Sequence, residues 1–411
     1  MRKFTVLLLF FYMAATTSFA GGYQVGLHGM RNIGMGLIGT SLSNDASSLF
    51  YNPGAVSFVN DKWSFSGGAS FLMARTTFQP LNVNEQYKLE HKINNPLYFY
   101  AAYKVTKNLS VGLAVNTPYG NGLSWGKEWI GRYLIQDLSF RAFTFQPTVS
   151  YKFKDIIGIG AGLVYSYGSV DLNKAIPIQG ANGDGTLNIN GNTGKFGFNA
   201  GILVHPEKGW SLGLSYRSKI EMSVKGASAT FSVPQSMSTA FPQTKVDVML
   251  PLPANLDFGA SYEFGKRNQW MIGMNLCYVF WGTYDSLTFT FEKVSETQAV
   301  TRSSTAALYS DQLIVRLGAQ YKINDLITAR IGGYYDPSPV RNDHLNPQTP
   351  SSDQIGLTCG LSVMPVKGLS IDAAFLYIKG TKRSGTFSPE NFPGTYNNAV
   401  YSPGIGLTYS F

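Results

Sequence analysis

Apolar residues alternate with small or polar residues in fourteen separate stretches of the chain, and this period of two predicts β-strands with one apolar face. The stretch at the end of the chain shows the pattern clearly. Ile405, Leu407 and Tyr409 fall on one face, whereas Gly406 and Thr408 fall on the other. Such strands form the wall between lipid and a wet lumen in transmembrane barrels. The expected strands cover residues 62–78, 94–106, 109–117, 138–153, 157–173, 188–204, 209–226, 246–264, 269–292, 305–323, 326–336, 353–364, 369–381 and 398–411.

The connections between these stretches alternate between short and long. Short polar links lie at 107–108, 154–155, 206–208, 265–268, 324–325 and 365–367, and long connections lie near 79–93, 118–137, 174–187, 227–245, 293–304, 337–352 and 382–397. Short turns at one end, long loops at the other and an even strand number are typical of bacterial outer-membrane barrels. A secreted β-sandwich would also alternate, but nothing would require its turns to sort by length. We therefore expect an all-β fold, a 14-stranded antiparallel transmembrane β-barrel with both termini on the periplasmic side.

The composition also suits a membrane wall. Charged residues make up 14% of the chain, whereas a soluble domain usually carries about 25%. No stretch after Gly21 approaches the roughly 18 apolar residues of a spanning helix, so a membrane form has to cross as a closed barrel. The net charge is +9, but the basic residues are scattered. We expect outer-membrane lipid or lipopolysaccharide as a partner, and no nucleic acid.

The start of the chain has the layout of a secretory signal. Arg2 and Lys3 precede an apolar run at 4–15, and small residues at 18–20 predict cleavage after Ala20. We assign residues 1–20 to a signal peptide and expect an outer-membrane location. The terminal Phe411 agrees with this, because outer-membrane barrels commonly end on an aromatic residue.

Residues 21–60 do not read as strands and precede the barrel of residues 61–411. Glycine-rich sequence of this length is either a disordered leader or a plug, which we call the hatch, folded into the lumen. Interspersed apolar residues such as Leu37, Leu49 and Phe58 favour the hatch, because disordered segments are poor in them.

Catalysis and metal binding find little support. Cys277 and Cys359 are the only cysteines, and alternation places them on opposite faces, so we expect two free thiols. The four histidines form no metal-ligand cluster with cysteine. His91 follows Glu90 and His344 follows Asp343, but such loop pairs are usually solvated surface. We expect no enzyme, no cofactor and no metal.

Several motifs, taken in order, resemble the FadL/TodX family of outer-membrane transporters of long-chain fatty acids and other hydrophobic compounds. They lie at 34–47, 51–55, 125–133, 145–151, 216–219, 250–253 and 335–340, and the aromatic C-terminus follows them. Together they span most of the mature chain. The family usually has Asn-Pro-Ala in its hatch, whereas Gly54 here separates Pro53 from Ala55.

The resemblance implies a hatch-plugged barrel whose third strand kinks inward and opens a side exit to the outer leaflet. It places the transport path along hatch residues Phe50, Tyr51, Asn52, Pro53 and Gly54. The side exit would lie at Asn116, Thr117 and Pro118, with residues around Asn52 behind it. Alternatively Pro118 simply ends the third strand, since proline cannot donate to the ladder.

Charged residues inside the barrel meet the fatty-acid carboxylate in family members. Tyr167 and Ser310 stand here at positions where a family member has basic residues, so the carboxylate contacts stay unidentified. Alternation instead directs four basic residues into the lumen: Arg217, Lys219, Arg316 and Arg330. They either hold the hatch through ion pairs or contact the ligand.

One loop carries aromatic residues at helical spacing. Trp125, Trp129 and Tyr133 lie four residues apart and predict an apolar helical stripe. The stripe either packs on the barrel rim or forms a surface site that first captures ligand.

These observations predict passive outer-membrane transport of a hydrophobic molecule, with long-chain fatty acids favoured and lateral exit through the wall. Alternatively, the protein is an aromatic-hydrocarbon transporter of the same family. A general porin for hydrophilic solutes is the alternative in another class, but a porin needs no hatch. We expect a monomer.

Overall fold

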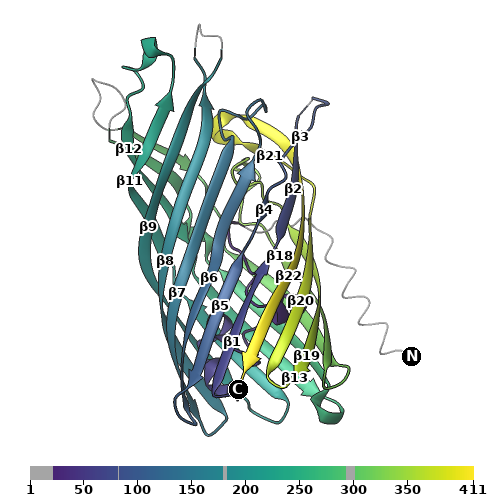
Figure 1. The fold of residues 1–411 in the computed structure, drawn as a ribbon. Helices are drawn as coiled ribbons and strands as arrows, with labels where there is room; N and C mark the ends of the chain where they lie inside the picture. Colours follow the sequence, from purple (N-terminus) through teal and green to yellow (C-terminus); the bar gives the residue numbers. More distant parts are fainter. Residues whose placement is uncertain (1–21, 82, 179–182, 293–300) are drawn as a thin grey trace.

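The computed structural model describes residues 22–411 except 82, 179–182 and 293–300. The expected signal peptide, residues 1–20, lies outside the described residues. The described part of the chain forms one β-barrel with short helices inside it (Figure 1).

The strands belong to a single antiparallel sheet. In chain order they are β1 (Trp63–Ser70), β2 (Leu72–Pro80), β3 (Tyr87–Lys88), β4 (Ile93–Asn94), β5 (Leu97–Lys104), β6 (Leu109–Ser124), β7 (Asp137–Phe153), β8 (Ile157–Ile176), β9 (Gly185–Val204), β10 (Trp210–Arg217), β11 (Ile220–Ser232), β12 (Thr244–Leu252), β13 (Asn255–Phe264), β14 (Trp270–Val279), β15 (Ser286–Phe291), β16 (Thr301–Ala306), β17 (Gln312–Lys322), β18 (Ile327–Asp336), β19 (Gln354–Val366), β20 (Leu369–Gly380), β21 (Arg383–Phe387) and β22 (Phe392–Ser410).

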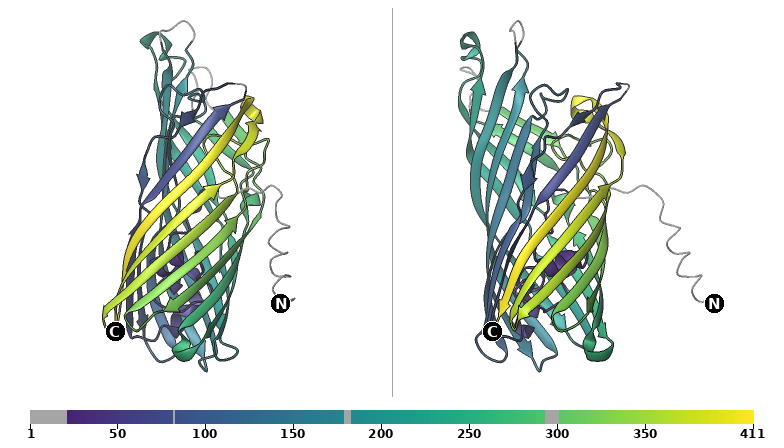
Figure 2. Two further views of the ribbon diagram at one scale, coloured as in Figure 1. Left: turned by 90° about the vertical axis from the view of Figure 1, so that its right-hand side faces the viewer. Right: turned by 45° about the vertical axis from the view of Figure 1, so that its right-hand side comes forward.

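The barrel has 14 strands and is closed, as predicted. Five barrel strands are interrupted once and appear as the pairs β1/β2, β10/β11, β12/β13, β14/β15 and β16/β17. Closure comes from the first and last strands, which pair from Ser64↔Ser410 to Ser70↔Gly404. The strands slant around the barrel axis in every view (Figure 2). Pairing of the first strand with the last removes the two outer edges of the sheet, which is what a wall in lipid requires.

The predicted alternation of faces is confirmed along the wall. Ile355, Leu357 and Leu361 of β19 point outward with about half of their surface exposed, while Thr358 and Ser362 on the other face are buried. Cys277 is buried and Cys359 is exposed, and both are free thiols. The short links gather at the end that carries the C-terminus, which we call the turn end (Figure 1). The long connections gather at the opposite end, the loop end.

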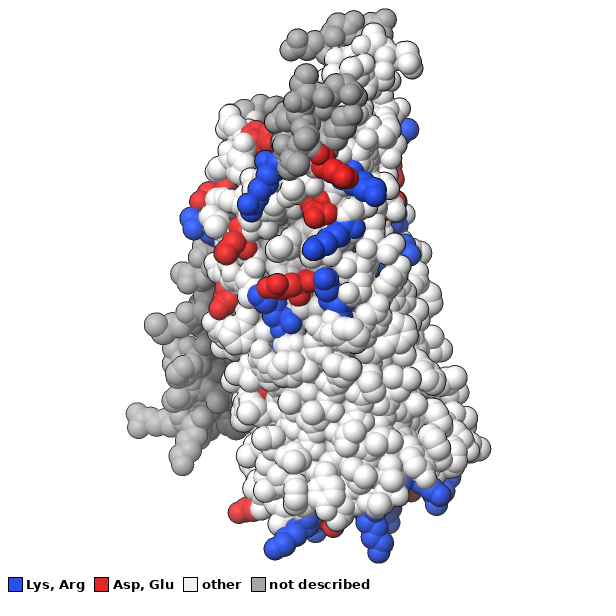
Figure 3. Space-filling model, turned by 90° about the vertical axis from the view of Figure 1, so that its left-hand side faces the viewer, with Lys and Arg blue, Asp and Glu red and all other residues white. Residues whose placement is uncertain are grey.

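The outer wall has a band with few charges. On the face shown in Figure 3, charged residues gather at the bottom rim and over the upper part, and the surface between them is nearly uncharged. Outward side chains of β8 and β9 are apolar, such as Phe196, Phe198 and Leu163, each more than half exposed. Among the described residues, no helix combines the length and hydropathy needed to cross a membrane.

The segment before β1 lies inside the barrel (Figures 1 and 2). It contains the short helices α2 (Met30–Gly34) and α3 (Ser48–Tyr51) and the 3₁₀ helix η1 (Pro53–Phe58). Helix α2 packs against β18, β19 and β20, and η1 packs against β7, β8 and β9. Four further 3₁₀ turns lie in the connections: η2 (Gln235–Met237), η3 (Lys266–Asn268), η4 (Trp281–Thr283) and η5 (Ser388–Glu390).

Candidate functional site

Asn52 fastens the hatch to the inner wall. Its side-chain oxygen accepts a hydrogen bond from the Gly54 amide at 3.0 Å and so caps η1. Its Nδ2 donates to the carbonyls of Thr40 at 2.7 Å and Ile202 at 2.9 Å. Asn52 is fully buried. One amide therefore links two parts of the hatch to β9.

Glycines allow the hatch and the wall to approach backbone to backbone. A Cβ on Gly54 would lie 2.6 Å from the Gly201 carbonyl oxygen and 2.7 Å from that of Gly158, so no larger residue fits there without a shift. Pro53 packs in the same way against Gly160 of β8. The inward glycines of β8 and β9 therefore form a seat for the Asn-Pro-Gly motif.

Phe50 connects the hatch to a lumen cation. Its carbonyl accepts a hydrogen bond from Arg217 at 2.9 Å, and its ring lies 4.5 Å from the guanidinium carbon. The ring also contacts His28, with centroids 4.0 Å apart. Tyr51, next in the chain, is buried against Gly39.

Most of the predicted lumen charges contact the hatch or the wall. Arg316 donates to the carbonyl of Leu37 at 3.3 Å. Arg330 donates to Gln320 at 2.7 Å and to the Ser362 hydroxyl. The bonds of Arg217 and Arg316 favour the first of the two roles considered for the lumen charges, in which they hold the hatch, whereas those of Arg330 join neighbouring wall strands.

A buried charge cluster provides a further anchor. Arg31 of α2 lies 3.2 Å from Asp45 of the hatch and 3.2 Å from Asp372 of β20. Asp372 also accepts hydrogen bonds from Ser370 at 2.8 Å and Thr408 at 3.2 Å. The carboxylates are thus paired and hydrogen-bonded, which buried charges require.

Lys219 does not face the lumen, and the prediction that it does is wrong. Arg217 and Ser218 are both buried, so the alternation skips one position between β10 and β11. This shift turns Lys219 outward, where it pairs with Glu221 at 2.6 Å. A single irregular residue reverses the face of every residue that follows it.

The third barrel strand also differs from its prediction. β6 does not end at Pro118 but continues to Ser124, with a shift in its register against β7 between Asn116 and Tyr119. On its other side the pairing with β5 stops at Tyr98↔Asn116. The proline therefore sits at an irregularity inside the strand, a position that proline tolerates.

An opening in the barrel wall, which we call the wall opening, lies beyond this last pair. Its empty volume is about 1060 Å³. Its lining comes from the end of β4 and the start of β5 (93–97), from β6 (117–122) and from β7 (139–143), together with Leu72, Ala74 and Val25. The predicted residue Thr117 lines it, and its hydroxyl bonds the Leu97 amide at 3.1 Å in place of a ladder partner.

Residues 23–25 cover the wall opening from inside. The Val25 amide donates to the Pro118 carbonyl at 2.9 Å, and the Gly120 amide donates to the Tyr23 carbonyl at 3.0 Å. Gln24 and Tyr119 form an antiparallel bridge between these bonds. The N-terminal segment thus replaces the strand that β6 lacks. The residues behind the opening are 23–25, and the expectation that they lie around Asn52 is wrong.

A second space, the central cavity, lies on the lumen side of Tyr23; it encloses about 780 Å³ of non-atom space, including space open to solvent. Apolar side chains from β7, β8, β11, β12 and β15 line it, among them Phe140, Leu172, Met222 and Leu250. The polar lining residues are neutral, and none of the described residues that line the cavity carries a charge. The cavity therefore suits an apolar guest.

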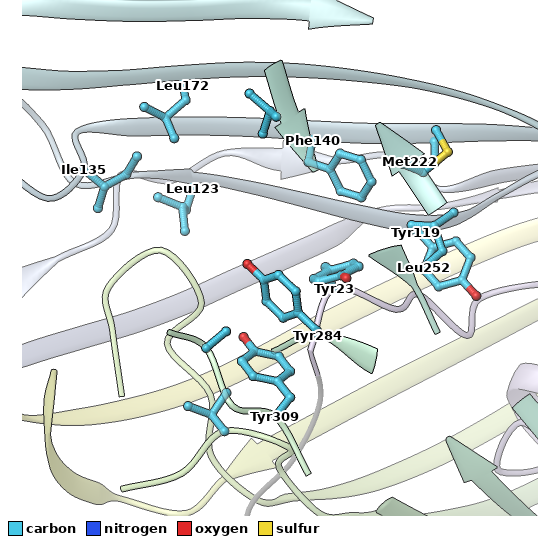
Figure 4. Packing of buried hydrophobic residues seen from close by; sticks show 14 of the residues in the cluster. Tyr23, Tyr119, Leu123, Ile135, Phe140, Leu172, Met222, Leu252, Tyr284 and Tyr309 are labelled. Carbon is cyan, nitrogen blue, oxygen red and sulfur yellow. The ribbon is translucent and has the colours of Figure 1, made fainter. Parts of the chain in front are cut away.

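Aromatic rings surround Tyr23. Its ring lies edge-on to Trp281 at 5.0 Å, Phe140 at 5.7 Å and Tyr284 at 5.9 Å. Its hydroxyl donates to the Pro251 carbonyl. Figure 4 shows Tyr23 between Tyr284 and Tyr119. Because Tyr23 lines the central cavity while Val25 lines the wall opening, the segment 23–25 separates the two spaces.

The central cavity continues toward the loop end into a third space, the mouth, with an empty volume of about 820 Å³. The two spaces share Leu172, Ile189, Tyr284, Leu287, Phe289 and Gln348. The mouth is more polar, and its charged lining residues are Lys174 and Glu390.

The aromatic loop after β6 is not a helix, contrary to the prediction. Trp125 and Trp129 are buried and stacked, with centroids 4.7 Å apart. They pack against Phe78, and Trp125 donates to the Pro347 carbonyl at 3.0 Å. Tyr133 lies apart from them, bonded to Asp184 at 2.7 Å and lining the mouth. The two tryptophans thus pack inside the rim and leave no exposed apolar stripe.

Sequence reasoning missed residues 23–25 as wall residues. Tyr23, Gln24 and Val25 alternate in polarity, but three residues are too few for that pattern to predict a strand. It also missed Lys174, which fell in a predicted loop although β8 extends to Ile176.

Comparisons of the sequence with known proteins identify its family. Residues 11–411 match the family described as outer membrane protein transport protein (OMPP1/FadL/TodX). The long-chain fatty acid transport protein of Salmonella typhi is 22% identical over 97% of this chain and 96% of its own length. The protein of the same name from Escherichia coli K12 is 21% identical over the same shares.

Solved structures agree on the fold. A Pseudomonas aeruginosa FadL homologue superimposes with a TM-score of 0.83 at 18% identity, covering 95% of this chain and 100% of that one. The Pseudomonas putida toluene transporter TodX gives 0.73 at 16% identity, covering 95% and 99%. The chain therefore belongs to the OMPP1/FadL/TodX family of outer-membrane proteins, whose members are transport channels for hydrophobic compounds and not enzymes.

Proposed function

We propose that this protein carries long-chain fatty acids passively into the outer membrane and releases them sideways through its wall. The observation that carries the proposal is the end of β5–β6 pairing at Tyr98↔Asn116, directly beside the wall opening. Asn121 and Phe140 line both the cavity and the wall opening. An apolar molecule in the central cavity would therefore contact residues that also line the wall opening.

Lateral release also suits the energetics. A saturated chain loses about 0.8 kcal/mol for each CH₂ that it exposes to water, so exit into lipid avoids a large cost. The segment 23–25 would act as the gate, because it is held to β6 by the two backbone bonds at Pro118 and Gly120. Three residues can leave the wall without disturbing the ladders of the barrel strands.

The hatch would block the way through the lumen to the turn end, so that the transported molecule leaves through the wall. Residues 21–60 are proposed to plug the lumen toward the turn end, seated on the glycines of β8 and β9 and tied by Asn52, Arg31 and Arg217. Monomeric assembly and contact with lipopolysaccharide remain predictions.

Two other functions are weighed against this one. Aromatic hydrocarbons are the second candidate cargo, because the aromatic side chains of Tyr23, Phe140 and Tyr284 line the central cavity. A general porin for hydrophilic solutes is less compatible, since the central cavity is lined by apolar and neutral residues.

Uptake by cells that lack their own hydrophobic transporters tests the proposal. Cells expressing this protein would be offered radiolabelled oleate, toluene and maltotriose separately, with empty-vector cells as control. We expect oleate uptake well above the control and maltotriose uptake equal to it. Uptake of maltotriose without uptake of oleate would contradict the proposal and favour the porin.

A further inference from the structure

The outer wall carries a groove in the half of the barrel nearest the turn end. It encloses about 960 Å³ of non-atom space, including space open to solvent. Its lining comes from β13, β14, β17 and β18, together with Trp210 at the start of β10. Ile272, Leu317 and Ile331 line it and are each about half exposed or more. The groove therefore opens on the side of the wall that faces lipid.

Small side chains on the outer face create this groove. Ala319 of β17 pairs with Ile272 on one side and with Ile331 on the other, so it forms a floor between two branched side chains. Gly333 of β18 pairs with the larger Leu317 in the same way. The lining residues carry no charge. An acyl chain suits such a slot, because apolar groups in a membrane associate through close packing.

Aromatic rings border the groove toward the turn end. Each ring centroid lies 4.2–6.3 Å from the next, and the rings in order are Trp210, Tyr262, Phe264, Trp270 and Tyr321. Girdles of aromatic residues mark the level at which a membrane protein passes from hydrocarbon to head groups. The groove lies on the loop side of these rings and is therefore at the height of the acyl chains.

Two cations lie on the other side of the aromatic rings. Lys266 and Arg267 are the first two residues of η3, the turn between β13 and β14, and both are exposed. Neither forms an ion pair with a carboxylate among the described residues. Tyr262, which lines the groove, precedes Lys266 by four residues, roughly 13 Å along a strand. A lipid phosphate at η3 therefore brings its acyl chain to the groove.

We propose that the groove and η3 together bind one anionic phospholipid of the periplasmic leaflet, with its phosphate at Lys266 and Arg267 and one acyl chain over Ala319. Short turns are periplasmic in outer-membrane barrels, so the position of η3 determines the leaflet. Basic residues at a membrane surface attract anionic lipids, and two of them favour such a head group over a zwitterionic one. The site lies on the outer face of the wall and does not depend on the transported cargo.

Native mass spectrometry of the whole protein tests the proposal, with dioleoylphosphatidylglycerol or dioleoylphosphatidylcholine added to the detergent solution. The wild type should bind one phosphatidylglycerol about tenfold more tightly than phosphatidylcholine, since two cations act on the charged head group. Ala319→Phe fills the groove and should weaken both lipids about threefold or more, because the acyl chain loses packing contacts. The double variant Lys266→Gln, Arg267→Gln should bind the two lipids equally.

Two matched controls should change neither affinity. Ala373→Phe places the same ring on the outer face of β20, and the double variant Lys107→Gln, Lys154→Gln removes two exposed cations from other turns. Heat-modifiable gel mobility would show that each variant is folded. The site is wrong if the wild type binds both lipids equally, or if either test variant behaves like its control. A protein dimer that Ala319→Phe abolishes, without lipid adducts, would instead show that a second copy covers the groove.

Discussion

The amide of Val25 donates a 2.9 Å hydrogen bond to the carbonyl of Pro118, two residues that lie far apart in the sequence. The bond joins the N-terminal segment to the irregular position in β6, where pairing with β5 has ended. It satisfies a wall carbonyl that would otherwise lack a partner, which is costly in a membrane. The proposed lateral exit requires this contact to break.

Filling the wall opening should block exit without affecting binding. A Cβ on Gly120 would have the Phe140 carbonyl oxygen as its nearest neighbour at 3.4 Å, so a large side chain can project into the opening. Gly120→Phe should slow oleate uptake about tenfold, equivalent to a barrier raised by about 1.4 kcal/mol. Gly120→Ala is the control and should transport normally. Equal uptake by both variants would place the exit elsewhere.

Much of the wall could be predicted from the sequence, because each barrel strand repeats a local pattern. Side chains such as Leu357 and Thr358 reveal their faces through polarity alone. The errors occur where one residue breaks the period. Ser218 shifts the alternation and sends Lys219 outward, and Pro118 lies within a strand that it was expected to end.

The candidate site was harder to predict because its parts come from distant segments. Tyr23 meets Phe140 and Trp281 only after the barrel has closed around the N-terminal segment. Trp125 and Trp129 have helical spacing, yet packing against Phe78 and the loop at Pro347 determines their conformation. Tertiary contacts of this kind override local periodicity.

Removing the Asn52 side chain should loosen the hatch. Asn52→Ala leaves the Thr40 carbonyl and the Gly54 amide without the side chain that bonds them, and each unsatisfied buried group costs about 1–3 kcal/mol. We expect higher ion conductance in planar bilayers. Asn52→Gln, which keeps the amide, should be milder. If Asn52→Ala leaves conductance at the wild-type level, the amide does not secure the hatch.

The Arg31 cluster gives an independent test of the same anchor. Arg31→Met leaves Asp45 and Asp372 buried without their cation, and breaking a buried ion pair costs about 3–5 kcal/mol. Conductance should rise. The triple variant Arg31→Met, Asp45→Asn, Asp372→Asn removes the uncompensated charges and should recover part of the stability. A triple variant as leaky as the single one would argue against a charge origin.

Acid should loosen the hatch through His28. Its Nε2 donates to the Val25 carbonyl at 2.8 Å, its Nδ1 has no partner among the described residues, and burial lowers its pKa to about 3. Below pH 6.5 His28 in a released hatch is protonated, whereas buried His28 in the packed hatch stays neutral. The packed state of the hatch therefore becomes less stable as the pH falls. At pH 5 the loss amounts to about 2 kcal/mol.

Conductance of the wild type should therefore rise between pH 7 and pH 5. His28→Gln, which can still donate to Val25 but does not titrate, should show a flatter response. Identical pH profiles for the two proteins would exclude His28 as the group responsible.

The most direct test of lateral exit is a disulfide that locks residues 23–25 to β6. Gln24 and Tyr119 form the bridge flanked by the two backbone bonds, a pair type whose Cα atoms lie roughly 4.5 Å apart, within the disulfide range. In the double variant Gln24→Cys, Tyr119→Cys, oxidation should stop oleate uptake while oleate binding persists. Reduction should restore uptake. The two single variants control for loss of either side chain. If uptake with the disulfide formed is as fast as in the reduced protein, residues 23–25 are not the gate.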